Sequence, residues 1–428
     1  MNNNNTLKVG TDFSGIGAPE QALTNLGINY ESVFACEIDK FARKSYKAIH
    51  PKPETFYNDI TQRNHAEVEQ LDLYIAGFPC QTFSIAGSRK GFDDVRGTLF
   101  FNVADFIRIN QPKCFVLENV KGLLSHNNGA TFQTIVSLLS DNGGTANGQV
   151  SIPYFEDGLG YHIYYSVLNS KNHGVPQNRE RIFIVGFRDF RSFSFPKSEP
   201  LKIKLKDVLQ DNPDYFKLID GFNSWNNIKY VDNDFCGTIT QHQSREGITN
   251  GFKIQYDKES NEVDDKYFLS DKTLSKLNIE TEQGTMIKKS VKNEISTCID
   301  ASYYKGFGIR NGVCRQVVKV PSATSKGFEE ATDGDSINYS VPNSKTRRGR
   351  VGKGVAQTLD TDSNMAVFND KKIRRLTPLE CWRLQSFPDE QLFKAQAVNS
   401  DTQLYKQAGN SITVRVIQKI ISKIYETV

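Results

Sequence analysis

Short apolar runs alternate with glycine-containing turns and helix-like segments along the first half of the chain. Strand-like runs occupy residues 7–9, 32–36, 55–57, 73–76, 113–117, 162–167 and 181–186. After the first of them, Pro19 has a position typical of a first helical turn, and Gly27 marks the end of that helix. Strands that alternate with helices predict a parallel-rich α/β sheet, in which ligands bind at the carboxyl ends of the strands.

A glycine-rich turn follows the first predicted strand at residues 11–17, with the sequence Thr-Asp-Phe-Ser-Gly-Ile-Gly. Glycine lets a backbone approach a ligand closely, and the start of the next helix offers free N–H groups. Taken alone, a Gly-x-Gly pair is equally typical of an ordinary tight turn. The residues that end the neighbouring strands make this turn more informative.

Two acidic residues end the second and third predicted strands. Glu37 lies twenty positions after Gly17, where a carboxylate is suited to ribose hydroxyls. Asp59 follows the run 55–57, where a carboxylate can accept a hydrogen bond from an adenine amino group. Either acid alone is typical of a solvated loop, but the two together favour a nucleoside ligand. Because the turn lacks the third glycine of a dinucleotide fingerprint, S-adenosylmethionine is favoured over NAD.

A thiol and a carboxyl group follow the next two predicted strands. Cys80 follows the run 73–76, and Glu118 follows the run 113–117. Both are expected at the ligand-binding edge of the sheet, where a thiol without a metal or disulfide partner suggests covalent catalysis. Arg179 and Arg181 enter the last strand. They are typical either of surface charge or of guanidinium forks that hold a phosphate or a pyrimidine carbonyl oxygen.

Composition narrows the class of protein. The chain has 428 residues, which favours two domains, and 38% of them are apolar. No apolar run is long enough to cross a membrane, and the first residues do not resemble a secretory signal. The seven cysteines form no CxxC pair and no zinc-like pattern with the six histidines. We therefore expect a cytoplasmic protein with reduced thiols and no metal site, and the net charge of +4 only mildly favours a nucleic-acid partner.

The pattern changes between about residues 190 and 372. Short β-prone stretches such as 236–240 and 297–300 are separated by polar, lysine-rich loops. The loop 344–353 has five basic residues and no acidic one, which suits phosphate contact, although a solvated loop is the alternative. The sequence therefore predicts a second, β-rich domain with a basic loop.

Helical signals return near the end of the chain. Residues 377–380 have the form of a capping box with proline at the first helical position. Asn410 and Ser411 are expected to cap a last helix, whose isoleucines at 417, 420, 421 and 424 have helical spacing. That apolar stripe predicts core packing and no chemistry.

These motifs together resemble those of DNA (cytosine-5) methyltransferases of the bacterial and phage restriction-modification type. The matching stretches keep the order of the family and lie at 12–17, 77–81, 96–100, 118–120, 177–181, 375–381 and 409–412. The resemblance covers roughly residues 6–190 and 372–428. It implies a Rossmann-like fold that binds S-adenosylmethionine and a smaller mixed β-rich target-recognition domain, with duplex DNA between them.

The resemblance also implies how the chain is divided. We expect a catalytic and cofactor-binding domain over residues 1–190. A target-recognition domain is expected over residues 191–399, including the helix region 373–390. Residues 400–428 are expected to return to the large domain. The protein is expected to be monomeric and to protect host or phage DNA from restriction, with possible pairing to a restriction endonuclease.

The reaction implied by the resemblance starts with a cytosine flipped out of the duplex. Cys80 would add to carbon 6 as a thiolate, which makes carbon 5 nucleophilic towards the methyl donor. Glu118 would protonate or hydrogen-bond the ring nitrogen, a role that needs a raised pKa. Arg179 and Arg181 would hold the carbonyl oxygen of the base, the neighbouring phosphate and the thiolate. Residues 81–96 would form a loop that closes over the DNA.

Two groups of binding residues follow from the resemblance. Those expected at S-adenosylmethionine, which leaves as S-adenosylhomocysteine, are Phe13, Gly15, Gly17, Glu37, Ile38, Asp59, Ile60, Pro79, Leu99, Asn410 and Ser411. Those expected at DNA are Gln81, Ser84, Arg347, Arg348, Arg350 and Lys353. An RNA cytosine methyltransferase and a catalytically silent DNA-binding relative are the alternatives. The basic loop argues against the first, and the intact Cys80, Glu118 and Arg181 argue against the second.

Overall fold

The structure is a computed structural model of the whole chain. The residues that it describes are 6–79 without 52 and 54, 99–140, 158–210, 263, 265–267, 269, 280–281, 317–341, 344–361, 364–369 and 372–426. Cys80, Gln81 and Ser84 lie outside the described residues, as do the stretches 236–240 and 297–300.

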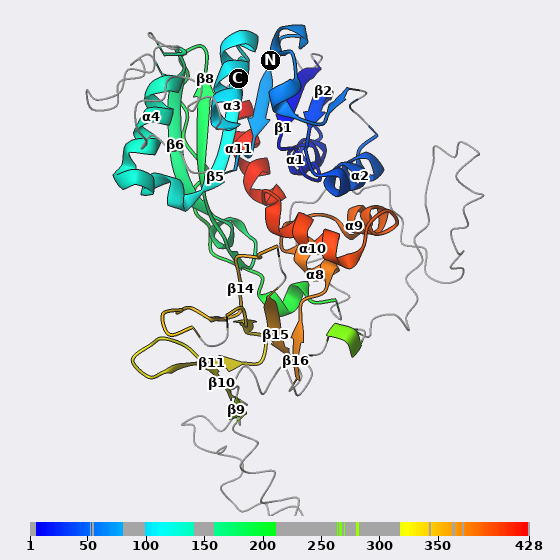
Figure 1. The fold of residues 1–428 in the computed structure, drawn as a ribbon, viewed down its shortest axis with the longest axis vertical. Helices are drawn as coiled ribbons and strands as arrows, with labels where there is room; N and C mark the ends of the chain where they lie inside the picture. The colour runs from blue at the N-terminus through cyan, green and yellow to red at the C-terminus, as the bar shows by residue number, and fades with distance from the viewer. Residues whose placement is uncertain are drawn as a thin grey trace, which may run out of the picture.

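A seven-stranded sheet forms the large domain (Figure 1). Its strands, in spatial order, are β3 (Phe56–Tyr57), β2 (Tyr30–Cys36), β1 (Leu7–Asp12), β4 (Leu73–Ala76), β5 (Cys114–Val120), β8 (Glu180–Phe187) and β6 (His162–Asn169). Only β8 runs antiparallel to its neighbours β5 and β6. The strand order reverses between β1 and β4, and such a switch point is where open α/β sheets bind ligands. Each of the seven strand-like runs in the sequence forms a strand of this sheet, so all seven predicted strands are confirmed.

Helices cover both faces of this sheet. The helices are α1 (Ala18–Asn25), α2 (Lys40–Ile49), α3 (Leu99–Asn110), α4 (Ala130–Leu139) and α11 (Val414–Glu426). Because side chains alternate along a strand, one set of strand residues packs with α1 and α11, and the other set packs with α3 and α4. The predicted isoleucine stripe of α11 lies in the first of these cores, as expected. Among the described residues, no helix has the length and apolar character to cross a membrane.

Three short helices connect the two parts of the molecule: α8 (Pro378–Arg383), α9 (Asp389–Gln396) and α10 (Asp401–Asn410). Thr377 and Glu380 form the predicted capping box of α8. Helix α9 packs on α2, and α8 to α10 lie between the sheet and the small domain in Figure 1. The predicted boundary at residues 399 and 400 stays a prediction.

The expectation that Asn410 and Ser411 cap the last helix is wrong. Asn410 is the last residue of α10, and the N–H of Ser411 donates to the Gln407 carbonyl, which completes that helix. Helix α11 starts at Val414, and its first turn closes on the carbonyl of Thr413. Asn410 and Ser411 therefore lie at the C-terminal end of α10.

The small domain is built from short strands. One sheet contains β11 (Phe328–Thr332), β10 (Val317–Pro321) and β9 (Glu280–Thr281), and another contains β13 (Val351–Gly352), β12 (Ser336–Asn338), β15 (Met365–Asn369) and β16 (Lys372–Arg375). A separate apolar core fills this domain. Strand β7 (Gln177–Asn178) pairs in parallel with β14 (Ala356–Gln357) and joins the small domain to the large one. Single turns of 3-10 helix lie at Ile60–Gln62, His65–Glu67, Lys121–Leu124, His126–Gly129, Ser170–His173, Leu205–Val208 and Asp265–Tyr267.

Candidate active site

The buried carboxyl group of Glu118 lies against the segment that leads to Cys80. Glu118 is near the end of β5 and is 9% exposed. Its Oε2 is 3.4 Å from the point where a Cβ on Gly77 would lie. Gly77 directly follows β4, so the ends of β4 and β5 meet as the sequence predicts. The structure therefore places Glu118 against Gly77, which precedes Cys80 by three residues in the sequence, at the predicted edge of the sheet.

Arg181 forms an ion pair with Glu118. The distance from Arg181 Nε to Glu118 Oε1 is 3.0 Å, and both side chains are largely buried. Burial raises the pKa of Glu118 above its ordinary value, although Arg181 and Arg179 act against this effect. The direction of this shift is the one that a proton donor to a ring nitrogen needs.

Arg179 connects two sequence motifs inside the protein. It is 2% exposed, and its Nη2 donates to the carbonyls of Gly409 at 3.0 Å and Ser411 at 2.8 Å. Burial, reinforced by the charge of Arg181, lowers the pKa of Arg179 to about 9. Its Nε and Nη1 are buried and have no hydrogen-bond partner among the described residues. Buried donors without a partner are costly, so these two point to a ligand or to a group outside the described part of the chain.

Asn119 holds the backbone that precedes Cys80. Its Nδ2 donates to the carbonyl of Phe78 at 3.0 Å, and its Oδ1 accepts the N–H of Val120 at 2.7 Å. Asn119 belongs to the motif at residues 118–120, but its residue type alone did not predict a role for it. The structure assigns it the positioning of the turn between β4 and the nucleophile.

The glycine turn adopts the left-handed backbone that its composition predicts. The φ angles are 55° at Phe13, 55° at Gly15 and 84° at Gly17. At Gly17 a side chain would collide with the ring of His50, so only glycine fits there. Ser14 fixes the turn to β2, since its hydroxyl accepts the N–H of Cys36 at 3.0 Å.

Glu37 is held beside this turn by two backbone groups. Its Oε2 accepts the N–H of Gly15 at 2.9 Å, and its Oε1 accepts the N–H of Asp39 at 2.8 Å. Burial raises its pKa despite these bonds. The next residue, Ile38, is 72% exposed, which is unusual for an isoleucine. Arg43 secures both, because its Nη1 donates to the carbonyls of Glu37 at 2.8 Å and Ile38 at 2.7 Å.

The predicted adenine segment is a short turn of 3-10 helix, η1 (Ile60–Gln62). Asp59 caps it, because its Oδ1 accepts the N–H of Thr61 at 2.9 Å and the hydroxyl of Thr61 at 2.8 Å. The side chain of Ile60 is only 4% exposed and packs in the core. The side chain of Ile60 is therefore not available for contact with a ligand.

The remaining predicted cofactor residues lie around the same edge. Pro79 is exposed at the end of the described part of its loop, and Leu99 is the half-buried first residue of α3. Asn410 is exposed and Ser411 is buried. A side chain on Gly409 would lie 2.8 Å from the carbonyl oxygen of Asp360, so the backbone of the small domain contacts the last turn of α10.

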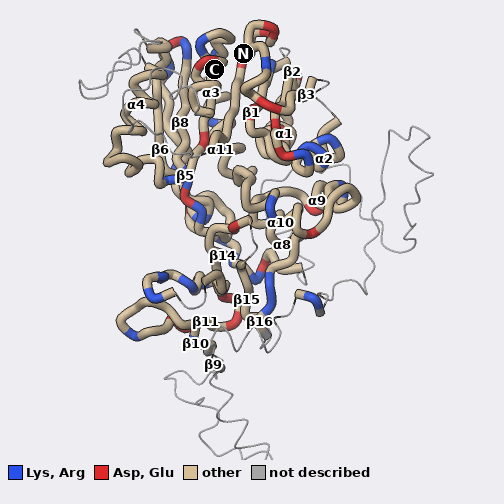
Figure 2. The backbone as a smooth tube through the Cα atoms, in the orientation of Figure 1, with Lys and Arg blue, Asp and Glu red and all other residues tan. Residues whose placement is uncertain are grey.

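The basic loop 344–353 differs from its prediction at one position. Arg350 is 2% exposed and donates to the carbonyls of Asn338, Ser340 and Val341. It holds the loop from within, so its predicted contact with DNA is corrected to a structural role. Figure 2 marks the basic positions of the small domain.

The other three predicted DNA residues of this loop are more accessible. Arg348 is exposed and donates to the Ala323 carbonyl at 2.8 Å, and Arg347 is half-buried. Lys353 is 61% exposed at its side chain and pairs with Asp335 at 2.9 Å. Across the described ranges, no group of three or more His, Cys, Asp or Glu side chains is arranged to hold a metal ion.

The fold and the site define a class of protein. A mostly parallel sheet with a glycine turn and an acid at the switch point is typical of Rossmann-like methyltransferases. The chain belongs to the C-5 cytosine-specific DNA methylase family, whose sequence profile matches residues 11–426. The protein is therefore a DNA (cytosine-5) methyltransferase, and the resemblance found in the sequence is confirmed.

Individual relatives agree with this assignment. The orphan methyltransferase M.SPRI of Bacillus phage SPR is 33% identical, and the match covers 98% of each chain. The type II methyltransferase M.HpaII of Haemophilus parainfluenzae is 32% identical over 97% of this chain and 88% of the relative. The S. pombe Dnmt2 methyltransferase superposes with a TM-score of 0.50 at 16% identity over 98% of each chain, which supports the Rossmann-like fold.

Proposed function

We propose that the methyl donor is S-adenosylmethionine and that it binds at the switch point between β1 and β4. The observation that carries this proposal is Glu37, whose carboxylate is fixed by the N–H groups of Gly15 and Asp39 at the end of β2. A carboxylate fixed in this way is suited to accept hydrogen bonds from ribose hydroxyls. The exposed Ile38 beside it supplies an apolar surface for the adenine ring.

The remaining cofactor residues fit the other parts of the same molecule. The described side-chain hydrogen bonds of Asp59 all involve Oδ1, which leaves Oδ2 for the adenine amino group. The glycine turn at Phe13, Gly15 and Gly17 allows close approach of the backbone. We assign Pro79, Leu99, the backbone of Ile60, and the pair Asn410 and Ser411 to the walls of this site. When bound, S-adenosylmethionine supplies an electrophilic methyl group on a sulfonium.

The protein side of the reaction needs a nucleophile and a proton donor. We propose that the thiolate of Cys80 adds to carbon 6 of the flipped cytosine, so that carbon 5 becomes nucleophilic. Glu118 carries a proton at neutral pH more readily than an exposed glutamate, and it donates to the ring nitrogen as the thiolate adds. Carbon 5 then takes the methyl group, and S-adenosylhomocysteine is the leaving group. Loss of the carbon 5 proton to a base, return of the ring-nitrogen proton to Glu118 and elimination of Cys80 as a thiolate restore the aromatic ring.

The two arginines have separate tasks in this proposal. Arg181 holds Glu118 through the 3.0 Å ion pair and faces the carbonyl oxygen of the base. Among the described residues, Arg179 has no partner for Nε and Nη1, and we assign these two donors to the thiolate or a phosphate, since buried donors require an acceptor. A cation beside a cysteine also lowers the pKa of the thiol and raises the thiolate fraction.

We propose that the duplex lies between the two domains and that Arg347, Arg348 and Lys353 contact its phosphates. Gln81 and Ser84, outside the described residues, are assigned to the loop that closes over the DNA. The relatives are named as orphan phage and type II methyltransferases, which supports protection of DNA from restriction as the biological role.

Incubation of the purified protein with tritiated S-adenosylmethionine and either duplex DNA or tRNA tests this proposal. We expect label in duplex DNA alone, and none with the variant Cys80→Ala. Bisulfite sequencing of plasmid DNA after expression should then show methylated cytosines in one short sequence context. No label in DNA, or label in tRNA, would contradict the proposal.

A further inference from the structure

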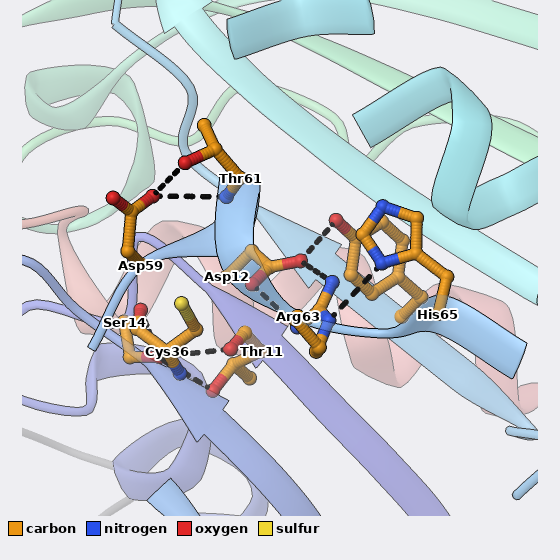
Figure 3. A network of polar contacts seen from close by, with 9 residues as sticks. Thr11, Asp12, Ser14, Cys36, Asp59, Thr61, Arg63 and His65 are labelled. Atoms are coloured by element: carbon orange, nitrogen blue, oxygen red, sulfur yellow. Dashed lines mark hydrogen bonds and ion pairs between the residues drawn. The ribbon is translucent and has the colours of Figure 1, made fainter. Parts of the chain in front are cut away.

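A fully buried ion pair lies beneath the cofactor half of the site and takes no part in the proposed chemistry (Figure 3). Arg63 Nη1 donates to Asp12 Oδ1 at 2.8 Å, and Nη2 donates to Oδ2 at 2.7 Å. The hydroxyl of Tyr74 donates to the same Oδ2 at 2.7 Å. Both charged side chains are completely buried.

Aromatic rings surround the guanidinium of Arg63. Its carbon lies 4.3 Å from the centre of the Phe34 ring and 4.5 Å from that of Phe106. Burial of a charge pair is costly, and an apolar pair of the same size is often at least as stable. Stability alone therefore does not explain why a charged pair occupies this position. Its bidentate geometry, by contrast, fixes the distance between two backbone segments.

The two segments joined by the pair both belong to the proposed cofactor site. Asp12 is the last residue of β1 and directly precedes the glycine turn. Arg63 directly follows η1, whose first turn is capped by Asp59. The core packing of Ile60 and the ion pair of Arg63 therefore fix η1 at both of its ends. Asp12 and Arg63 are 51 residues apart in the sequence.

We propose that Arg63 is a positioning residue for recognition of the adenine ring. By its bond to Asp12 it holds η1 against the end of β1, so that Asp59 meets the amino group of an adenine whose ribose is bound by Glu37. This inference rests on the proposed function, because it requires Asp59 to bind that amino group. Arg63 itself lies below the site and touches neither the cofactor nor the reacting atoms.

Comparison of two ligands separates adenine recognition from general binding. S-adenosylhomocysteine has the amino group, whereas S-inosylhomocysteine has a carbonyl oxygen in its place. Calorimetric titration of the wild-type protein should show a preference of about tenfold or more for the first ligand, since a bond to a charged acceptor is lost with the second. The variant Asp59→Ala should remove this preference, which tests the proposed function by itself.

Two variants then test Arg63. Arg63→Lys keeps the charge but loses the bidentate geometry. The double variant Asp12→Leu with Arg63→Met removes both charges and avoids an unpaired buried one. We expect both to reduce the preference to about threefold or less. Arg383→Lys is the matched control, because Arg383 forms a similar buried bidentate pair with Asp389 between α8 and α9.

The outcomes are distinct. A preference that falls in the Arg63 variants but not in Arg383→Lys supports the inference, whatever the melting temperatures of the variants. An unchanged preference, or an equal loss of affinity for both ligands, overturns it. If the wild-type protein binds both ligands equally, or if Asp59→Ala keeps the preference, the proposed role of Asp59 is refuted instead, and the role of Arg63 falls with it.

Discussion

Replacement of Glu37 by glutamine tests the cofactor site at its best-defined point. The two oxygens of Glu37 accept the N–H groups of Gly15 at 2.9 Å and Asp39 at 2.8 Å. Glutamine keeps only one of these acceptors, so one N–H would face an amide NH2 group. The ribose hydroxyls would also lose their charged acceptor. We therefore expect Glu37→Gln to weaken cofactor binding through the second effect and to lower the stability of the loop through the first.

The expected magnitude follows from the kind of bond lost. A hydrogen bond to a charged group contributes about 1.5–3 kcal/mol, so loss of one to the ribose should raise the Kd by about 10- to 150-fold. The unpaired N–H adds a penalty of about 1–3 kcal/mol, but this falls on the loop in the free protein as well and mainly lowers its stability.

Calorimetric titration with S-adenosylhomocysteine measures this change directly. Glu31→Gln is the matched control, because Glu31 lies on the same strand, β2, and is exposed. Its Kd should equal that of the wild-type protein. An unchanged Kd in Glu37→Gln, with the protein folded, would refute the ribose role.

The catalytic and DNA-binding residues give further predictions. Cys80→Ala should abolish methyl transfer but leave the Kd for S-adenosylhomocysteine unchanged; activity near the wild-type rate would remove the covalent step. Because burial raises the pKa of Glu118, its carboxyl keeps its proton to a higher pH than usual, and kcat/KM should fall on the alkaline side as that proton is lost. In Glu118→Gln this decline should disappear and the rate should drop by about 10²- to 10⁴-fold; a pH–rate profile checks both, and a decline that persists would exclude Glu118 as the titrating group. Arg348→Ala should reduce the slope of log affinity for DNA against log salt concentration by about one, as expected for the loss of one phosphate contact. Arg350→Met should mainly lower the stability of the small domain, by about 1–3 kcal/mol. A reduced salt dependence in Arg350→Met but not in Arg348→Ala would reverse these two roles.

Local patterns in the sequence predicted most of the large domain. All seven strands were found because buried parallel strands are short apolar runs between turn residues. The left-handed glycine turn was found because a positive φ is tied to glycine, and Glu37 lies beside it because the ends of adjacent strands are neighbours in space. The ribose role of Glu37 stays a prediction. Glu118 and Arg181 also meet as expected, since the ends of adjacent strands are neighbours in space.

Other features depend on contacts that no local pattern encodes. Arg63 lies among polar residues and has the sequence context of a surface arginine, yet its partner is 51 residues away and both are buried. Arg350 and Arg348 are two positions apart in the same basic loop, but only the first turns inward. Asn410 and Ser411 are suited to a helix start by residue type, whereas the end of α10 determines their place.

The pairing of β7 with β14 has a consequence for how DNA recognition reaches the chemistry. Gln177 and Asn178 bond to the small domain along two residues, and Arg179 is the next residue in the chain. Asn178 is bound further by the side chains of Gln357 and Thr358. Any rotation of the small domain as it settles on a target must either break this pairing or move the backbone of Arg179 with it. In the proposed mechanism, docking of the DNA and placement of Arg179 are therefore coupled through this pairing.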